Sequence, residues 1–149
     1  MTNFKLTTET KVNIFGTTLF RIELTADCRW GRKGDRGGFL AKETNLQGDA
    51  WVSGNAEVYG NAKVYGNAEV YGDAEVSGNQ WPKSPLQIQG TRHFVNVSKK
   101  DHLKIGCKEF SFTYWKENFK QIGIDQNYTS DEISEYEMYI NLAIKIYSK

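Results

Sequence analysis

Hydrophobic and small residues recur with a fixed six-residue period between residues 40 and 79. The aliphatic positions are Leu40, Leu46, Val52, Val58, Val64, Val70 and Val76, and the small ones are Thr44, Ala50, Ala56, Ala62, Ala68 and Ala74. Each small residue precedes an aliphatic one by two positions, so on an extended strand both side chains point to the same side. The pattern predicts a series of very short strands that share one buried face.

Glycine followed by asparagine or aspartate separates successive six-residue repeats, which we call hexads. These pairs are Gly54-Asn55, Gly60-Asn61, Gly66-Asn67 and Gly72-Asp73. Both residue types tolerate turn conformations, so each hexad is expected to be a short strand and a corner. Periodicity alone also allows β-hairpins with Gly-Asn turns, although hairpin strands normally run longer.

The hexads resemble those of the hexapeptide-repeat left-handed β-helix family, in which three hexads make one triangular coil. Seven consecutive hexads would then give slightly more than two coils, and the handedness rests on the resemblance alone. In such a coil, residues eighteen positions apart stack. Tyr59 would lie between Ala41 and Ser77, and Asn55 would lie over Asp73. Tyr59, Tyr65 and Tyr71 would therefore lie on three different faces instead of forming one ladder.

The C-terminal part of the chain changes to a helical period. In residues 111–123, apolar residues are spaced three and four apart, with Ser111 as an expected N-cap and Gly123 as an expected stop. In residues 129–149, Thr129 and Glu132 match a capping box. The apolar stripe that follows consists of Ile133, Tyr136, Ile140, Ala143, Ile144 and Tyr147. Two amphipathic helices joined by a short loop predict a helical hairpin.

The remaining segments are expected to end the repeat on both sides. Pro82 falls where the next aliphatic residue should be, and "LQIQGTRHFVNVS" and "HLKIGC" then predict an irregular capping coil over 80–110. At the other end, "TTLFRIEL" predicts a strand before an exposed Gly/Arg-rich connection. The expected fold is mainly β: a short left-handed parallel β-helix (solenoid) with an N-terminal strand segment and a C-terminal α-helical hairpin. Its expected parts are 1–39, 40–79, 80–110 and 111–149.

Charge and composition narrow the class of protein. The 149 residues carry 19 Lys and Arg against 18 Asp and Glu, so no overall field draws the chain to nucleic acid or a membrane. No apolar run approaches the roughly 20 residues that span a bilayer. The first residues lack the apolar core of a signal peptide, so we expect a cytoplasmic protein. Cys28 and Cys107 are too few for a disulfide framework and are expected to be reduced.

The resemblance to hexapeptide-repeat proteins implies two kinds of enzyme, and the residues argue against both. Acyltransferases of this group use a histidine base and a loop beside the coils, but residues 40–79 hold neither histidine nor cysteine. The carbonic anhydrase branch needs three histidine ligands, and the chain has only His93 and His102. No close Cys or His pair suggests zinc. We expect no catalytic residue, metal or cofactor. His93 remains a candidate ligand-site residue, with a structural hydrogen bond within the capping coil as its alternative role.

Two short basic groups raise the question of nucleic-acid contact. The first consists of Arg29, Arg32, Lys33 and Arg36 beside Trp30, and the second of Lys99, Lys100, Lys104 and Lys108. Charge combined with an aromatic ring can bind nucleic acid, but aspartates interrupt both groups and the whole chain is nearly neutral. A solvated loop is the alternative, so nucleic-acid contact stays open.

The order of segments also resembles a group of small phage and prophage proteins with "GNAxVY" repeats. The similarity runs from "KGDRGGFLAKETNLQGDAWVSGNAEVYGNA" to "YWKENFKQIGIDQNYTSDEISEY" and covers roughly Phe20 to Tyr147. It implies a phage protein in the host cytoplasm, and small phage proteins often bind and block host defence complexes. This leads to the hypothesis of a non-catalytic binding module that inhibits such a complex, as anti-CRISPR proteins do.

The hypothesis predicts a host protein or nucleoprotein complex as the partner. The candidate contact residues are Arg29, Trp30, Arg32, Lys33, Arg36, Trp51, Tyr59, Tyr65, Tyr71 and Trp81, because aromatic and arginine side chains dominate binding interfaces. Two alternatives remain: a relative of the hexapeptide acyltransferases with a site near His93, and a structural solenoid that self-assembles as a dimer or trimer.

Overall fold

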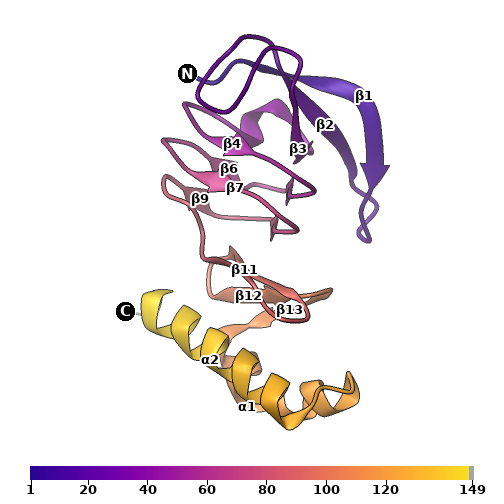
Figure 1. The fold of residues 1–149 in the computed structure, drawn as a ribbon, viewed down its shortest axis with the longest axis vertical. Helices are drawn as coiled ribbons and strands as arrows, with labels where there is room; N and C mark the ends of the chain where they lie inside the picture. The colour runs from indigo at the N-terminus through magenta and orange to yellow at the C-terminus, as the bar shows by residue number, and fades with distance from the viewer. Residues whose placement is uncertain (148–149) are drawn as a thin grey trace.

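The computed structural model describes residues 1–147 and shows an elongated molecule (Figure 1). A β-sheet that contains the N-terminus lies at one end, and two helices lie at the other. The strands are β1 (Phe4–Val12), β2 (Thr18–Leu24), β3 (Arg36–Leu40), β4 (Trp51–Val52), β5 (Glu57–Val58), β6 (Lys63–Val64), β7 (Glu69–Val70), β8 (Glu75–Val76), β9 (Gln80–Trp81), β10 (Gln87–Gln89), β11 (Phe94–Lys99), β12 (His102–Ile105) and β13 (Lys108–Ser111). The helices are the 3₁₀-helix η1 (Glu43–Asn45), α1 (Phe112–Asp125) and α2 (Ser130–Tyr147).

The prediction of a mainly-β, left-handed parallel β-helix is wrong. Within residues 1–147, the thirteen strands form four small sheets and close into no solenoid. One sheet is mixed, in the order β1-β2-β3-β5-β8; another, β10-β11-β12-β13, is antiparallel; β4-β7 and β6-β9 are parallel pairs. The hexad strands are only two residues long and each pairs with one or two neighbours. Most of the extended pairing therefore comes from the antiparallel segments on either side.

The side-chain pattern of the hexads is confirmed. The alanines and valines of residues 50–76 are almost completely buried in one core, as the alternation in sequence predicts. The eighteen-residue offset is confirmed for β4–β7 and β5–β8, where Val52 lies beside Val70 and Val58 beside Val76. Strands β6 and β9 pair with an offset of seventeen instead, with Val64 beside Trp81. At the Gly60 corner φ is +60°, and a Cβ atom would lie 2.4 Å from the Ser77 carbonyl oxygen, so only glycine fits there.

Amide side chains occupy the free edges of the hexad strands. Asn96 donates its Nδ2 to the Glu75 carbonyl at 2.8 Å and accepts from the Glu75 amide at 3.3 Å. Gln87 donates to the Glu69 carbonyl at 2.9 Å and accepts from the Tyr71 amide at 2.8 Å. Each side-chain amide therefore bonds one main-chain N–H and one main-chain carbonyl at the strand edge, as a neighbouring strand would. We call Asn96 and Gln87 the edge amides.

The N-terminal segment forms a long antiparallel hairpin that continues the first sheet. The strand predicted from "TTLFRIEL" is confirmed as β2, which pairs with β3 through Phe20 and Leu40. Strand β1 was not predicted. Phe39 on β3 is buried, and the ammonium of Lys11 and the guanidinium of Arg21 lie 4.1 and 4.3 Å from its ring centre. These cations cover an aromatic face that would otherwise contact water.

Residues 80–110 form mainly antiparallel strands instead of the expected irregular coil. After β9 the chain enters the antiparallel sheet β10–β13, whose strand β11 adjoins β8 through a hydrogen bond from the Ser77 amide to the Ser98 carbonyl, 2.9 Å long. Each successive strand reverses direction, so the parallel pairing of the hexads stops here. This sheet separates the hexads from the helices (Figure 1).

Both helices begin where the sequence predicts. The Ser111 hydroxyl accepts a hydrogen bond from the Tyr114 amide at 3.1 Å, and Thr129 and Glu132 form the reciprocal bonds of a capping box. Helix α1 continues two residues past the expected stop at Gly123. Gly123 instead lies against α2, because a Cβ atom there would come within 2.8 Å of Ile133 Cγ1. Among residues 1–147, no helix is long and apolar enough to cross a membrane.

Candidate functional site

Three of the aromatic residues predicted to contact a partner lie in the core. Trp51, Tyr59 and Trp81 are 4%, 9% and 5% exposed, and Trp81 donates its indole N–H to the Gly78 carbonyl at 2.8 Å. Trp51 and Trp81 belong to the main core cluster, and Tyr59 packs with Leu19 and Phe39 in a second, smaller one. These three residues therefore form no part of the surface offered to a partner.

The remaining repeat tyrosines lie apart from each other. Tyr65 is half-buried and follows β6, whereas Tyr71 is 41% exposed, follows β7 and packs edge-on against Phe94 with ring centres 6.4 Å apart. The strands that they follow belong to different sheets. The two rings therefore form no shared stacking platform.

Several side chains of the Gly/Arg-rich segment are already paired with other groups of the protein. The guanidinium of Arg29 lies 4.4 Å from the Trp30 ring centre, and the Trp30 indole donates to the Asp49 carbonyl at 2.8 Å. Arg36 forms an ion pair with Glu9. Arg32 and Lys33 are exposed. The segment is an ordered surface loop in which only part of the predicted basic group faces solvent without an ionic partner.

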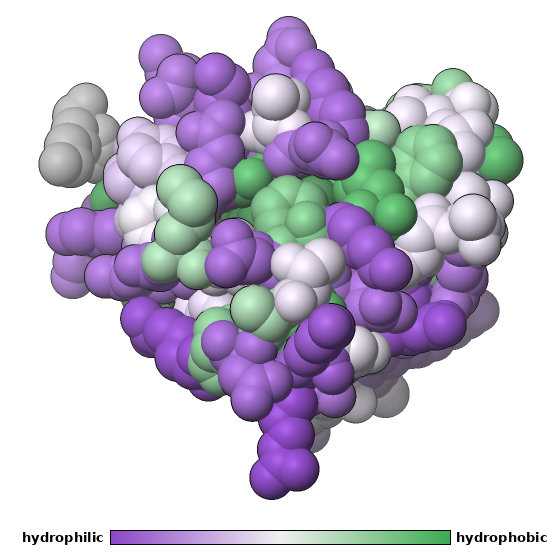
Figure 2. Space-filling view, turned by 90° about the horizontal axis from the view of Figure 1, so that it is seen from above, coloured by the Kyte–Doolittle hydropathy of each residue, from purple (hydrophilic) through white to green (hydrophobic). Residues whose placement is uncertain are grey.

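Three strongly exposed apolar residues lie elsewhere, at the tip of the β1–β2 hairpin. Val12, Ile14 and Phe15 are 65%, 85% and 66% exposed. Viewed from the N-terminal end, most of the molecule is hydrophilic, with hydrophobic residues near the centre and toward the side where the hairpin lies (Figure 2). Three exposed apolar side chains this close together make the hairpin tip a candidate binding surface. The signal available in the sequence was "VNIFG", an Asn-to-Gly turn with apolar residues inside it.

Hydrogen bonds fix the shape of this hairpin tip. The Asn13 carboxamide oxygen accepts from the amides of Phe15 and Thr17 at 2.9 and 3.0 Å. The Asn13 main chain adds bonds of 3.0 Å to Thr17 and to Gly16, where φ is +80°. Asparagine and glycine thus close a compact turn without help from the apolar side chains. The main chain of Ile14 and Phe15 is held in position, and both side chains remain largely exposed.

Tyr59 connects the hairpin tip to the core. Its ring centre lies 6.4 Å from that of Phe15. Burial of the hydroxyl, followed by the nearby carboxylates of Glu75, Glu109 and Glu57, raises the pKa of Tyr59 well above its usual value. The phenol therefore stays neutral at physiological pH, and its ring is tilted by 38° against that of Phe15.

A cleft of about 350 Å³ opens beside the hairpin tip. Its lining residues are Val12, Asn13, Ile14, Glu57, Glu75, Lys104, Gly106 and Cys107. Two ion pairs lie along it: Lys11 to Glu57 at 2.8 Å and Lys104 to Glu75 at 3.0 Å. Burial raises the pKa of the Glu75 carboxyl, and the Lys104 ammonium opposes that change. The cleft thus places polar, partly desolvated groups next to the apolar tip.

Two polar atoms beside this cleft lack a hydrogen-bond partner within residues 1–147. They are the buried Asn13 Nδ2, a donor, and the buried Glu57 Oε1, an acceptor. Buried polar atoms are nearly always paired, because an unmade hydrogen bond costs about 1–3 kcal/mol. Both atoms are themselves buried, so a molecule in the cleft would reach them only after a local rearrangement. We use "tip site" for Val12, Ile14 and Phe15 together with this cleft.

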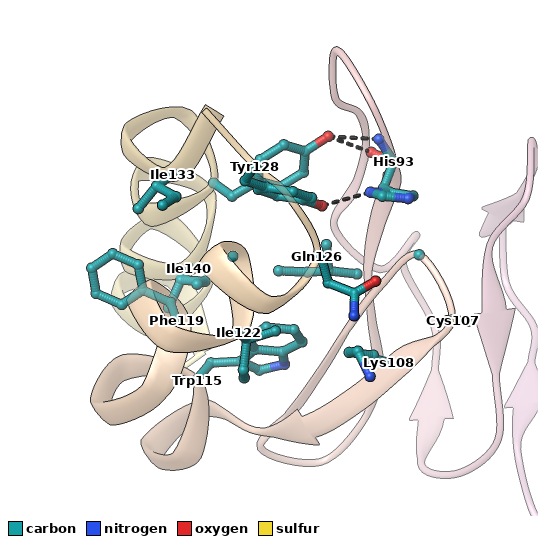
Figure 3. A pocket seen from close by; sticks show the side chains of 14 residues that line it. His93, Cys107, Lys108, Trp115, Phe119, Ile122, Gln126, Tyr128, Ile133 and Ile140 are labelled. Carbon is teal, nitrogen blue, oxygen red and sulfur yellow. Dashed lines mark hydrogen bonds between the residues drawn. The ribbon is translucent and has the colours of Figure 1, made fainter. Parts of the chain in front are cut away.

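His93, the candidate ligand-site residue, lines a second cavity between β11–β13 and the helices (Figure 3). Its Nδ1 lies 2.5 Å from the Tyr128 hydroxyl, and the two rings stack with centres 5.7 Å apart. The side chains of Trp115, Phe119, Ile122, Ile133 and Ile140 form the apolar wall. The free volume of this cavity is about 40 Å³, which is room for a small apolar group or a few water molecules.

The contacts of His93 are structural and join the antiparallel sheet to the loop before α2. One imidazole nitrogen contacts Tyr128, and burial raises the pKa of that phenol to about 12. Tyr128 is therefore a neutral hydrogen-bond partner instead of a base. The predicted structural bond of His93 is present, although its partner lies in the loop before α2. Among the described residues, no group of three or more His, Cys, Asp or Glu side chains could hold a metal ion.

Comparison of the chain with protein-family models, with curated proteins and with solved structures finds no significant match in any of the three.

Proposed function

We propose that the protein acts by binding another protein without catalysing a reaction, and that the tip site is its anchor. The observation that carries the proposal is the exposure of Ile14 and Phe15 on a turn that Asn13 closes by hydrogen bonds. A turn that is already formed loses little further backbone entropy on binding, which favours affinity. The proposed target is a host defence complex of the kind that small phage proteins block.

The tip site also specifies what the partner surface must contain. Val12, Ile14 and Phe15 require an apolar pocket, since apolar anchors contribute most when they are fully desolvated. The Lys104–Glu75 ion pair lines the cleft beside these anchors and would meet a polar or charged group at the rim of that pocket. Apolar contact would supply affinity, and the polar pair would fix orientation.

A pull-down from a bacterial lysate that contains a defence complex tests the proposal. The tagged wild type is compared with an Ile14→Glu/Phe15→Glu variant and with Ile124→Glu, which changes an apolar residue of α1 that is 58% exposed. We expect a stoichiometric complex on the wild type and the Ile124 variant, and its loss from the tip variant. His93→Ala should retain capture, whereas an enzyme acting through His93 would lose activity.

Other outcomes would overturn the proposal. Equal capture by the wild type and the tip variant would show that the hairpin is not the anchor. A wild type that captures nothing, and purifies as a discrete assembly of its own, would favour the self-assembling structural protein. Circular dichroism of each variant separates lost binding from lost folding.

A further inference from the structure

Helix α2 carries apolar side chains on the side that faces away from the core. Met138, Leu142 and Ile146 are 64%, 41% and 47% exposed and follow one another at intervals of four residues. Residues at this spacing lie along one side of a helix. The buried residues of α2, Tyr136, Ile140 and Ala143, lie on a different face. The exposed stripe is therefore additional to the surface by which α2 packs on the rest of the chain.

Opposite charges lie at equal distances on either side of Met138. Asp131 precedes it by seven positions and Lys145 follows it by seven, and both residues are exposed. Seven residues are close to two full helical turns, so all three lie on the same side of α2. Neither charge forms an ion pair within the part of the chain that the structure describes.

We propose that this side of α2 pairs with the same side of a second copy, with the two helices antiparallel. A two-fold axis at Met138 places the two Met138 side chains against each other and Lys145 of each copy against Asp131 of the other, because these residues are equidistant from the axis. Parallel pairing would instead place Asp131 beside Asp131 and Lys145 beside Lys145. Charge therefore selects the antiparallel arrangement.

The same register matches large side chains with small ones. Leu142 and Ser134 each lie four positions from Met138, so Leu142 of one copy faces the exposed Ser134 of the other. A serine leaves room for the leucine, and the two helices can approach closely at both contacts. Ile146 lies beyond them, at the rim of the paired surface.

The pairing surface is small and separate from the tip site. A few side chains on one helix form a narrow contact, which fits an association that depends on concentration better than an obligate dimer. Helix α2 lies at the end of the molecule opposite the N-terminal sheet (Figure 1), so pairing through α2 leaves the β1–β2 hairpin exposed on both copies. The inference therefore holds whether or not the tip site binds a host protein.

Sedimentation velocity over about 1–200 μM protein measures the pairing, a range in which weak dimers dissociate. We expect a monomer–dimer equilibrium for the wild type and a monomer at all concentrations for Met138→Glu, which brings two carboxylates together at the axis. Asp131→Lys and Lys145→Asp should each weaken the dimer about tenfold, because each change replaces two attractive pairs by two repulsive ones. The double variant should recover wild-type association. Ile124→Glu, on α1, should associate as the wild type does.

The charge swap makes the result decisive. A wild type that stays monomeric throughout the range would overturn the inference, as would a Met138→Glu variant that still dimerises. If the double variant Asp131→Lys/Lys145→Asp does not recover the dimer affinity that each single variant loses, the antiparallel arrangement is wrong. Helical circular dichroism of every variant shows whether α2 remains folded.

Discussion

The hydroxyl of Tyr136 hydrogen-bonds the main chain of His93 at two points. It accepts from the His93 amide at 2.6 Å and donates to the His93 carbonyl at 3.2 Å. The Arg92 amide also donates to it, at 2.9 Å. A side chain of α2 therefore hydrogen-bonds the main-chain groups of the turn between β10 and β11. This turn positions the His93 imidazole against Tyr128. The helices and the antiparallel sheet depend on each other through this contact.

Tyr136→Phe should lower the free energy of unfolding by about 2 kcal/mol, because it leaves the Arg92 and His93 amides without a partner in a partly buried turn. Tyr139→Phe is the matched control: its hydroxyl bonds only the Glu135 carboxylate, so its removal should cost less than about 1 kcal/mol. Urea unfolding followed by circular dichroism measures both. Equal losses in the two variants would contradict the role given to Tyr136.

Asn96→Ala should destabilise the protein by about 2–3 kcal/mol, since it removes an edge amide and leaves the Glu75 amide and carbonyl unpaired. Asn55→Ala, an exposed asparagine at a hexad corner, should change stability by less than about 0.5 kcal/mol. Amide hydrogen exchange at Glu75 locates the effect. If Glu75 keeps its protection in Asn96→Ala, the edge amide does not stabilise β8.

Glu75 gives the stability a specific dependence on pH. Its folded pKa is raised by burial, so the folded protein binds a proton more readily than the unfolded chain, and stability falls as pH rises from the ordinary value of 4.5 through the raised one. Glu75→Gln removes this titration. The stability of the variant relative to the wild type should therefore increase across that interval as pH rises.

Thermal unfolding from pH 4 to pH 8 measures this difference. Glu69→Gln, at the equivalent position of the preceding hexad, controls for the loss of one negative charge. A constant difference between Glu75→Gln and the wild type at every pH would show that the Glu75 carboxyl is not perturbed on folding.

Asn13→Ala should loosen the hairpin tip, because the Phe15 and Thr17 amides lose their shared acceptor. We expect a loss of about 1 kcal/mol in stability and faster hydrogen exchange at Thr17. Asn13→Asp keeps an acceptor oxygen and should retain the slow exchange. Similar exchange rates in the alanine variant and the wild type would mean that the turn does not depend on Asn13.

The sequence predicts the parts of this fold that depend on local periodicity. The small and aliphatic positions of the hexads identify the buried face because alternation fixes direction on a strand, and Ser111 and Thr129 identify helix starts because caps act within one turn. The way the strands assemble depends on residues far apart. Asn96 meets Glu75 across 21 positions, and nothing in either neighbourhood indicates that contact.

The candidate site was predicted less well, because exposure is a tertiary property. Trp51 and Trp81 have the residue type of interface anchors, yet the core encloses them. Ile14 has the residue type of a core side chain, yet it is 85% exposed. Only the folded hairpin shows that the turn at Asn13 holds it away from the rest of the molecule.

The edge amides have a consequence for how copies of this chain behave at high concentration. Near-identical hexads could in principle pair with hexads of another molecule as easily as with their own, which is the usual route from repeated strands to fibres. Asn96 and Gln87 occupy backbone groups at the edges of β8 and β7 and so remove two places at which such growth could begin. Two side chains thus help a repetitive segment to pair only within its own molecule instead of serving as a template for other copies.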